Sequence, residues 1–349
     1  DTALAFDSVN KTIMQEVEYG WLWRHMHGVA ASVIFLIIYI HMLTGIYYGS
    51  YKRGREMIWV SGMLLFVVFS AEAFSGYMLP WGQMSYWAAQ VITNLFGGIP
   101  LIGPELVIWI RGDYAVSDPT LTRFFMLHVC LLPIVIIAII AFHFYSLRIP
   151  HVNNEIAEEL DFDLEAEKYM AGDTKGSKVI PFWPGFLSKD FMYICLFMIF
   201  FFYLVSFKFS FAMDPINFDP ANALKTPAHI YPEWYFLWSY EVLRGFFFDI
   251  AGIKAFDIGL AAFGIAQIIF FLLPWLDRSD VVKPAHERPL FFIWFWVLLI
   301  DLIVLTIYGK LPPTGVNAWV GFYASIIFLL LFIVVLPVIT IMERKGAKQ

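Results

Sequence analysis

The chain has 349 residues, of which 60% are hydrophobic, 19% aromatic and 15% charged. This composition is that of a polytopic integral membrane protein. The net charge of −6 gives no reason to expect nucleic acid as a partner, and the sequence has no basic stripe, glycine-rich phosphate loop or nucleophile motif. The two cysteines, Cys130 and Cys195, lack CxxC or CxxCH spacing, which argues against a disulfide framework or a covalent c-type haem. We expect both to be small core residues.

The N-terminal stretch, residues 1–18, is mixed and polar, and shows no cleavable signal. Apolar runs close to the roughly 20 residues that a bilayer requires then recur along the chain. They fall at residues 26–48, 57–79, 122–147, 190–207, 256–275, 290–308 and 318–341. We therefore predict an all-α fold, a polytopic bundle of seven transmembrane helices.

The lysines and arginines are distributed unevenly between the connections. The connections 50–57, 148–189 and 276–289, together with the tail after 341, hold 14 of the 23. This surplus predicts that they and the C-terminus lie in the cytoplasm. The stretch 153–176 within them is acidic and polar and is interpreted as a solvated loop.

Four histidines lie inside predicted membrane helices. His27 and His41 are 14 residues apart on the first run, and His128 and His143 are 15 apart on the third. Each interval corresponds to roughly 21 Å along a helix and returns to nearly the same face. The two helices run in the same direction, because one crossing separates them. His27 can then meet His128 near the periplasmic side, and His41 can meet His143 near the cytoplasmic side.

Isolated imidazoles are costly in hydrocarbon, so two matched pairs indicate two stacked metal centres. Each pair would hold one iron of a non-covalent haem b from both axial positions, which leaves no open site for oxygen and favours electron transfer. The alternative is that these histidines are hydrogen-bonded structural residues.

Other residues fit the same hypothesis. Gly62 and Gly76, again 14 apart, would let the second helix approach the two haems, although small residues also serve ordinary helix packing. Arg24 and Arg123 lie within two turns of the periplasmic-side histidines and could neutralise haem propionates. Interfacial snorkelling is the alternative for both.

Two further segments carry a recognisable pattern, Pro232-Glu233-Trp234-Tyr235 and the stretch GYMLPWGQMS at 76–85. With the spaced histidines, they make the chain resemble cytochrome b of the quinol:cytochrome c oxidoreductase, the cytochrome bc complex. The resemblance extends from residue 19 to the final span.

The resemblance implies a quinol-oxidation pocket on the positive side of the membrane. There Glu233 would accept a proton from the quinol, and Tyr235 and Tyr77 would shape the pocket. One electron would pass to a Rieske iron-sulfur protein. The other would pass through the two stacked haems b to a quinone-reduction site on the cytoplasmic side, contributing to proton translocation. From the residues alone, Glu233 could equally be a cap within an aromatic belt.

For the reduction site, the resemblance implies Lys189 and Asp190, where a helix cap is the simpler alternative for the aspartate. Arg148 stands where mitochondrial members have a histidine, which is closer to the chloroplast-type and some bacterial relatives. Thr44 replaces an arginine that usually serves the cytoplasmic haem propionates. Glu72 has no counterpart in the family pattern, and we interpret it as a proton relay or a hydrogen-bond partner near the oxidation pocket.

The resemblance also implies a c-type cytochrome subunit as a partner, a homodimer, and a bacterial inner membrane as the location. It divides the chain into a dihaem-binding part, 1–207, and a C-terminal part, 208–349, that contains the Pro-Glu-Trp-Tyr segment. Because the family begins with one more span, we expect a truncated chain. Two alternatives are a dihaem membrane anchor of another quinone oxidoreductase and a proton-coupled transporter.

Overall fold

Long apolar runs become helices in this protein because a helix satisfies its own backbone groups where no water is available. The computed structural model describes residues 1–52, 54–150, 161–175, 179 and 181–346. Its α-helices are α1 (Thr2–Asp7), α2 (Gly20–Tyr47), α3 (Glu56–Met78), α4 (Gln83–Leu95), α5 (Gly103–Arg111), α6 (Asp118–Met126), α7 (Leu132–Arg148), α9 (Phe162–Met170), α10 (Leu187–Phe207), α11 (Leu237–Arg244), α12 (Ala255–Leu276), α13 (Pro289–Lys310), α14 (Val316–Leu330) and α15 (Leu336–Gly346).

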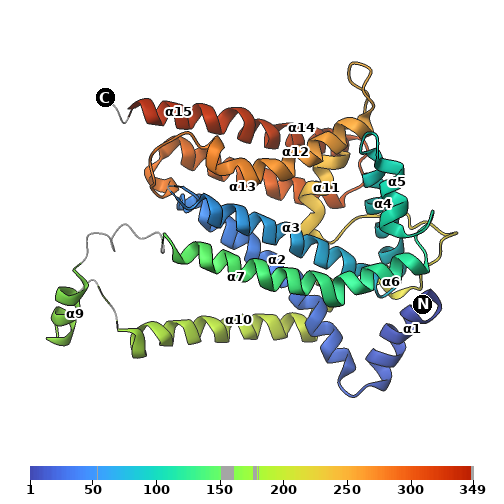
Figure 1. Cartoon of the computed structure of the whole chain (residues 1–349), viewed down its shortest axis with the longest axis horizontal. Helices are drawn as coiled ribbons and strands as arrows, with labels where there is room; N and C mark the ends of the chain where they lie inside the picture. Colours follow the sequence, from blue (N-terminus) through green and yellow to red (C-terminus); the bar gives the residue numbers. More distant parts are fainter. Residues whose placement is uncertain (53, 151–160, 176–178, 180, 347–349) are drawn as a thin grey trace.

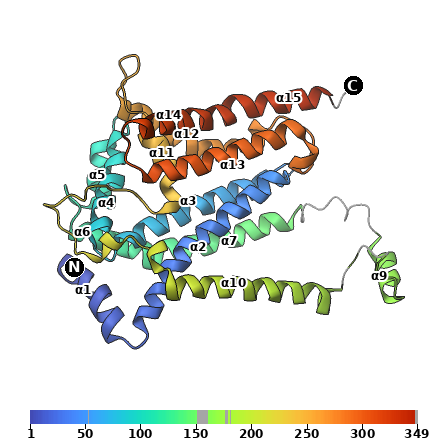
Figure 2. The ribbon, with the colours of Figure 1, turned by 180° about the vertical axis from the view of Figure 1, so that it is seen from behind.

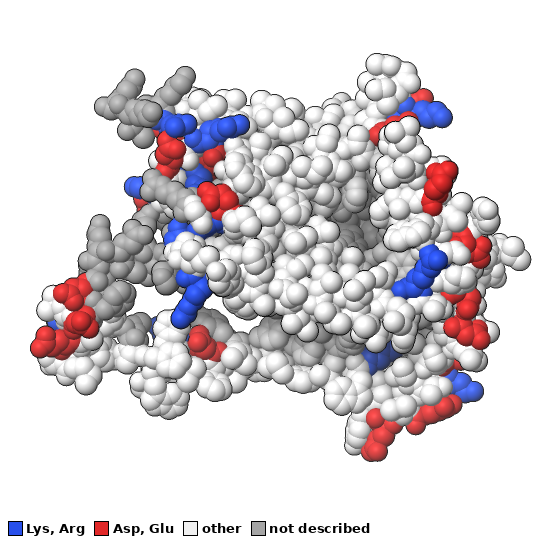
Figure 3. Space-filling model, in the orientation of Figure 1, with Lys and Arg blue, Asp and Glu red and all other residues white. Residues whose placement is uncertain are grey.

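Seven helical segments of the described chain are long and apolar enough to cross a membrane, which confirms the prediction. They are Gly20–Tyr47, Glu56–Met78, Asp118–Arg148, Phe182–Phe207, Ala255–Leu276, Pro289–Lys310 and Val316–Arg344. The third joins α6 to α7 through a π-helical turn, Leu127–Leu131, and the seventh joins α14 to α15 through another, Leu331–Val335. Figure 3 shows the consequence: charged side chains gather at the two ends of the molecule, with an uncharged belt between them.

Some spans begin earlier than hydropathy predicted. The first begins at Gly20 rather than at 26, and the third begins at Asp118 rather than at 122. Arg24 and His25 interrupt the apolar run of the first span, and Asp118-Pro119-Thr120 open the third, so a hydropathy pattern places both starts too late. At the third span a capping box between Ser117 and Thr120 fixes the start.

The helices form two groups around the site (Figures 1 and 2). In the first group α3 packs on α7 and α2 packs on α10; in the second, α11 packs on α12 and α13, and α13 packs on α14. The largest core cluster joins the groups: Phe35 of α2 and Phe66 of α3 belong to it together with Tyr235 and Trp238. α4, α5 and α6 lie at the same end as the N-terminus, opposite the C-terminus (Figure 1).

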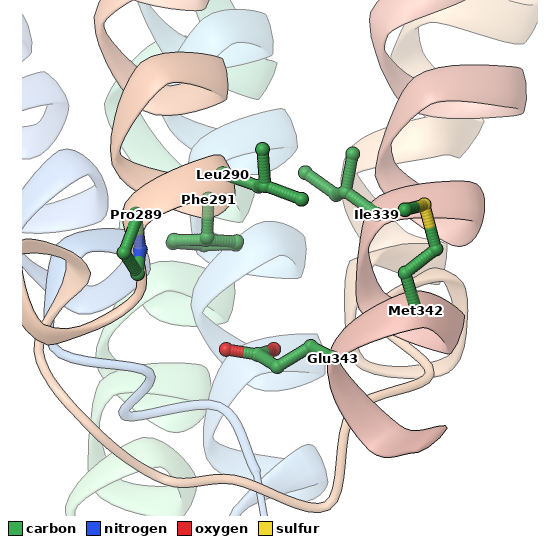
Figure 4. A pocket seen from close by; sticks show the side chains of 6 residues that line it. All are labelled: Pro289, Leu290, Phe291, Ile339, Met342 and Glu343. Carbon is green, nitrogen blue, oxygen red and sulfur yellow. The ribbon is translucent and has the colours of Figure 1, made fainter. Parts of the chain in front are cut away.

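A cluster of charges joins two connections to α15 at the C-terminal end. Lys52 Nζ lies 2.7 Å from Asp277 Oδ2, and Arg288 Nη2 lies 3.3 Å from the same oxygen and 2.8 Å from Glu343 Oε2. The Tyr51 hydroxyl donates to Asp277 at 2.7 Å. Beside this cluster, the start of α13 and α15 enclose a small cavity of about 310 Å³, into which Glu343 points (Figure 4).

The expectation for the cysteines was wrong. Cys130 and Cys195 are exposed on the outer faces of their helices. An apolar run does not distinguish a face that meets lipid from one that meets protein, because both favour apolar side chains. Of the polar stretch 153–176, residues 153–160 and 176 lie outside the described residues. The rest carries α9, a helix that the acidic, polar composition of this stretch did not indicate.

Candidate functional site

The four histidines meet as two pairs across the space between α2 and the third span. The ring centroids of His27 and His128 are 6.0 Å apart, with an interplanar angle of 82°. Those of His41 and His143 are 6.5 Å apart, with an angle of 78°. The pairs are those expected from the spacing, and they lie at two depths along helices that run side by side (Figures 1 and 2).

These separations fit one iron between the two rings of each pair. Two metal–imidazole bonds of about 2 Å each, plus about 1 Å from each nitrogen to its ring centre, put the centroids about 6 Å apart. The backbones of α2 and α7 share few close contacts, whereas α7 packs directly on α3. The space between α2 and α7 is therefore bridged by the histidine rings rather than filled by interlocked helices.

The two glycines of α3 lie where the sequence predicted, against the two pairs. A Cβ added to Gly76 would collide with the His128 ring, and one added to Gly62 would come within 3.2 Å of His143 Cε1. Only a residue without a side chain lets α3 come this close to the rings. A planar group bound between α2 and α7 would use the same clearance.

The Nδ1 atoms of two of these rings have different partners on α3. His143 Nδ1 lies 2.9 Å from the Ser61 hydroxyl. His128 Nδ1 lies 2.9 Å from the backbone oxygen of Glu72 and 3.0 Å from its carboxylate Oε1. Hydrogen bonds of this kind fix the ring so that Nε2 faces the opposite helix. The hydrogen-bond role predicted for Glu72 therefore has a partner in the structure.

The predicted arginines are placed less uniformly. Arg24 is buried and donates to Asn10 Oδ1 at 2.6 Å and to Met14 Sδ at 2.7 Å, so it anchors the N-terminal segment to α2. Arg123 is exposed and donates to the backbone oxygen of Trp109. The hydrogen bonds described for the two arginines are thus with residues outside the histidine pairs.

At the opposite end, the predicted reduction-site residues are exposed. Arg148 lies in the last turn of α7, and Lys189 and Asp190 lie in the first turn of α10. The ends of these two helices lie at the same end of the molecule (Figure 1). Thr44 donates to the backbone oxygen of Ile40 in its own helix at 2.7 Å, so it offers no substitute for the arginine it replaces.

The Pro-Glu-Trp-Tyr segment is fixed to α2 by aromatic residues. Tyr235 is buried and stacks on Phe35, with ring centroids 4.1 Å apart and an interplanar angle of 3°. The Tyr39 hydroxyl donates to the backbone oxygen of Tyr235 and accepts from Trp238 Nε1 at 2.9 Å. These contacts set the position of Glu233 relative to α2.

The start of the α10–α11 connection brings a further polar group toward Glu233. The N-terminal end of α4 holds Asn217 of this connection: the backbone N–H of Ser85 donates to Asn217 Oδ1 at 2.8 Å, and a Cβ on Gly82 would collide with Asn217. This contact fixes the 214–220 segment. There Asp214 accepts a hydrogen bond from the Tyr231 hydroxyl.

Glu233 is hydrogen-bonded and has a raised pKa. Its carboxyl accepts a hydrogen bond from the Tyr77 hydroxyl at the end of α3. Burial raises the pKa of Glu233 to about 7, the Tyr77 hydrogen bond acts in the opposite direction, and Asp214 adds to the rise. Burial, followed by the charge of Glu233, raises the pKa of Tyr235 well above its usual range. Glu233, Tyr235 and Tyr77 thus come together, as predicted.

Comparison with known proteins agrees with this geometry. The family profile described as Cytochrome b/b6/petB matches residues 1–150, and the profile described as Cytochrome b(C-terminal)/b6/petD matches residues 220–329. The chain belongs to the cytochrome b family. It is 42% identical over 354 residues to the cytochrome b of Rhodobacter capsulatus, covering 98% of this chain and 78% of that one. It is also 42% identical over 340 residues to that of Rickettsia bellii, covering 97% and 79%.

A solved structure titled "Hyperthermophilic respiratory Complex III" superposes with a TM-score of 0.87 at 39% identity, covering 99% of this chain and 85% of that one. The resemblance inferred from the histidines and the Pro-Glu-Trp-Tyr segment is therefore confirmed. Cytochrome b proteins bind haem b and form the core subunit of quinol:cytochrome c oxidoreductases.

Sequence reasoning missed several residues of this cytochrome b site. Asp214 and Tyr231 lie on a connection whose path follows from tertiary contacts, and Ser61 is one of many serines in apolar runs. One signal was present for Ser61: it directly precedes Gly62, whose place opposite a histidine was predicted. No comparable signal marks Asp214, apart from its position 19 residues before Glu233 on the same connection.

Proposed function

We propose that this cytochrome b oxidises quinol near Glu233 and supports reduction of quinone at the opposite end of the α2–α7 pair. The observation that carries the proposal is the pairing of four histidines at two depths, with centroids 6.0 and 6.5 Å apart. His27 and His128 would hold one haem b, and His41 and His143 a second. Haem b, when bound, supplies one-electron transfer.

The residues around Glu233 account for the proton side of quinol oxidation. A quinol releases two protons as it loses two electrons, and a carboxyl whose pKa is about 7 can accept a proton near neutral pH. Tyr77 orients that carboxyl, and Tyr235, clamped between Phe35 and Tyr39, holds the segment in place. Asp214, hydrogen-bonded to Tyr231, is a further polar group near Glu233.

At the other end, Arg148, Lys189 and Asp190 are the proposed quinone-reduction residues. Their support is their shared location at the cytoplasmic ends of α7 and α10, as inferred from the charge distribution. Gly62 and Gly76 would give the haems their clearance, and Arg24 and Arg123 remain candidates for propionate contacts.

The proposal places the chain in a bacterial inner membrane with its C-terminus in the cytoplasm. It gives the chain a Rieske iron-sulfur protein, a c-type cytochrome subunit and a second copy of itself as partners. The similarity to a chain of a respiratory complex III supports this assembly. We also retain the division into a dihaem-binding part, 1–207, and a C-terminal part, 208–349.

The decisive experiment replaces His41 and measures haem b in the purified complex. The His41→Leu variant should lose about half of its haem b and one of two components in the reduced-minus-oxidised spectrum, because each iron needs both ligands of its pair. His286→Ala is the control, since His286 is exposed and lies outside both pairs. Full haem content and both components in His41→Leu would contradict the proposal.

A further inference from the structure

The two histidines of the third span, His128 and His143, differ in the side chain that faces their Nδ1 atoms. Ser61, a neutral hydroxyl, lies 2.9 Å from His143 Nδ1. Glu72, an acid, lies 3.0 Å from His128 Nδ1 through its carboxylate and 2.9 Å through its backbone oxygen. Both partners come from α3, so one helix supplies a neutral group at one depth and an acidic group at the other.

The Glu72 carboxylate interacts with His128 through Oε1. His128 is its ion-pair partner among the described residues, and Glu72 Oε2 is buried without a hydrogen-bond partner there. An acid that is mostly buried inside a membrane helix is expensive, so its position needs compensation from His128, the group that it faces. A proton relay would need a second polar group at Oε2, and none lies there in the described chain. The geometry therefore favours the hydrogen-bond role over the relay.

We propose that Glu72 is a positioning residue that lowers the reduction potential of the haem held by His27 and His128, relative to that held by His41 and His143. The proposal rests on the haem ligation proposed above. A histidine that donates its Nδ1 proton to a carboxylate becomes a stronger electron donor to a metal, which stabilises the oxidised state. The negative charge also opposes the arrival of an electron nearby.

Ser61 has neither effect to a comparable degree, because a neutral hydroxyl gives a weaker hydrogen bond to imidazole and carries no charge. The two sites would then differ in the direction that favours movement of an electron from the Glu233 end toward the Arg148 end. Glu72 would act from within the membrane on the electron, whereas Glu233 acts at the interface on the proton.

The test is a redox titration of the haem b absorbance in the assembled complex, comparing wild type with Glu72→Gln. Glutamine keeps the size of the side chain and removes its charge. We expect one of the two components to become easier to reduce by about tenfold in its equilibrium constant, which is about 59 mV for one electron, while the other stays in place. The matched control is Ser61→Ala, which should leave the component moved by Glu72→Gln unchanged.

Three results would overturn the inference: no shift in Glu72→Gln, equal shifts of both components, or a shift of the same component in Ser61→Ala. If Glu72→Gln does not assemble, Glu72→Asp keeps the charge and withdraws it by one methylene. It should raise the same component by less, and an unmoved or lowered component would again contradict us. Failure of the haem proposal looks different, because wild type would then lack two haem b components altogether.

Discussion

The Tyr77 hydroxyl at the end of α3 is hydrogen-bonded to the carboxyl of Glu233, which directly precedes the Trp-Tyr turn that leads into α11. This contact joins the helix that carries Gly62 and Gly76 to the segment that carries the proposed proton acceptor. Electron and proton chemistry would therefore share one structural element, α3. Tyr77 directly follows Gly76 and lies five residues after Glu72, so the orientation of Glu233 depends on a residue close to the contacts of His128 on that helix.

Glu233 gives a prediction about pH. Its raised pKa, about 7, means that the carboxyl is mostly protonated below that pH and can accept a proton only above it. Quinol oxidation should therefore rise as the pH increases through about 7. Glu233→Gln should remove this rise and lower the rate by about tenfold, less than the roughly 10²–10⁴-fold typical of a general base, because water can enter a half-buried site. The measurement is steady-state quinol:cytochrome c reductase activity from about pH 5.5 to about 8.5, a range that brackets the titration.

Glu105→Gln is the matched control for that experiment. Glu105 is exposed in the first turn of α5, at the same end of the molecule, and has no role in the proposed site. Its variant should keep both the rate and the shape of the pH profile. A Glu233→Gln profile that still rises through about pH 7 would assign the titration to another group.

Periodicity and direction were enough to predict the histidine pairs. His27, His41, His128 and His143 repeat at helical intervals on two spans that run the same way, and those two facts determine which rings meet. The helices themselves follow from hydropathy, because a membrane imposes a length and leaves helices as the simplest solution. Their starts were less accurate, since caps such as the one at Ser117 carry little hydropathy signal.

The contacts that could not be predicted are those that form when the connections between helices fold. Asp214 and Tyr231 meet across 17 residues of one connection, and the charge cluster joins Asp277 and Arg288 to Lys52 of another connection and to Glu343 of α15. No local pattern specifies such meetings. The exposed position of Cys130 was missed for a different reason, because hydrophobicity alone does not separate an outer face from a core.

The close approach of α3 to the rings predicts a strong effect of Gly76→Ala. The added methyl group would overlap the His128 ring, and overpacking of this kind typically costs about 1–3 kcal/mol. We expect lower haem b content and a lower temperature of thermal unfolding. Gly62→Ala should be milder, because the nearest atom, His143 Cε1, would lie 3.2 Å away and can shift slightly.

Gly264→Ala in α12 separates crowding from helix propensity. A Cβ at Gly264 would meet nothing within 4 Å, so this change should leave haem content intact and stabilise the helix by up to about 1 kcal/mol. Equal losses of haem in Gly76→Ala and Gly264→Ala would show that the clearance at Gly76 is unimportant.

Breaking the buried charge cluster should lower the free energy of unfolding strongly and leave the haem b absorbance components unchanged. Arg288 is almost fully buried between Asp277 and Glu343, so Arg288→Met leaves acids without their partner and should cost about 3–5 kcal/mol. Arg344→Ala is the comparison, because the Arg344–Asp280 pair, at 2.8 Å, is exposed and should be worth about 0–1 kcal/mol. Thermal unfolding of the two variants in the same detergent measures the difference.

The location of this cluster decides how the result is interpreted. Lys52, Asp277, Arg288 and Glu343 hold together the ends of helices, and none of them touches a histidine pair. The folded fraction of Arg288→Met should therefore keep both haem b components at their wild-type potentials while it unfolds at a lower temperature. Similar unfolding temperatures for Arg288→Met and Arg344→Ala would mean that the remaining Lys52–Asp277 pair is sufficient, and that the cluster is more redundant than its burial suggests.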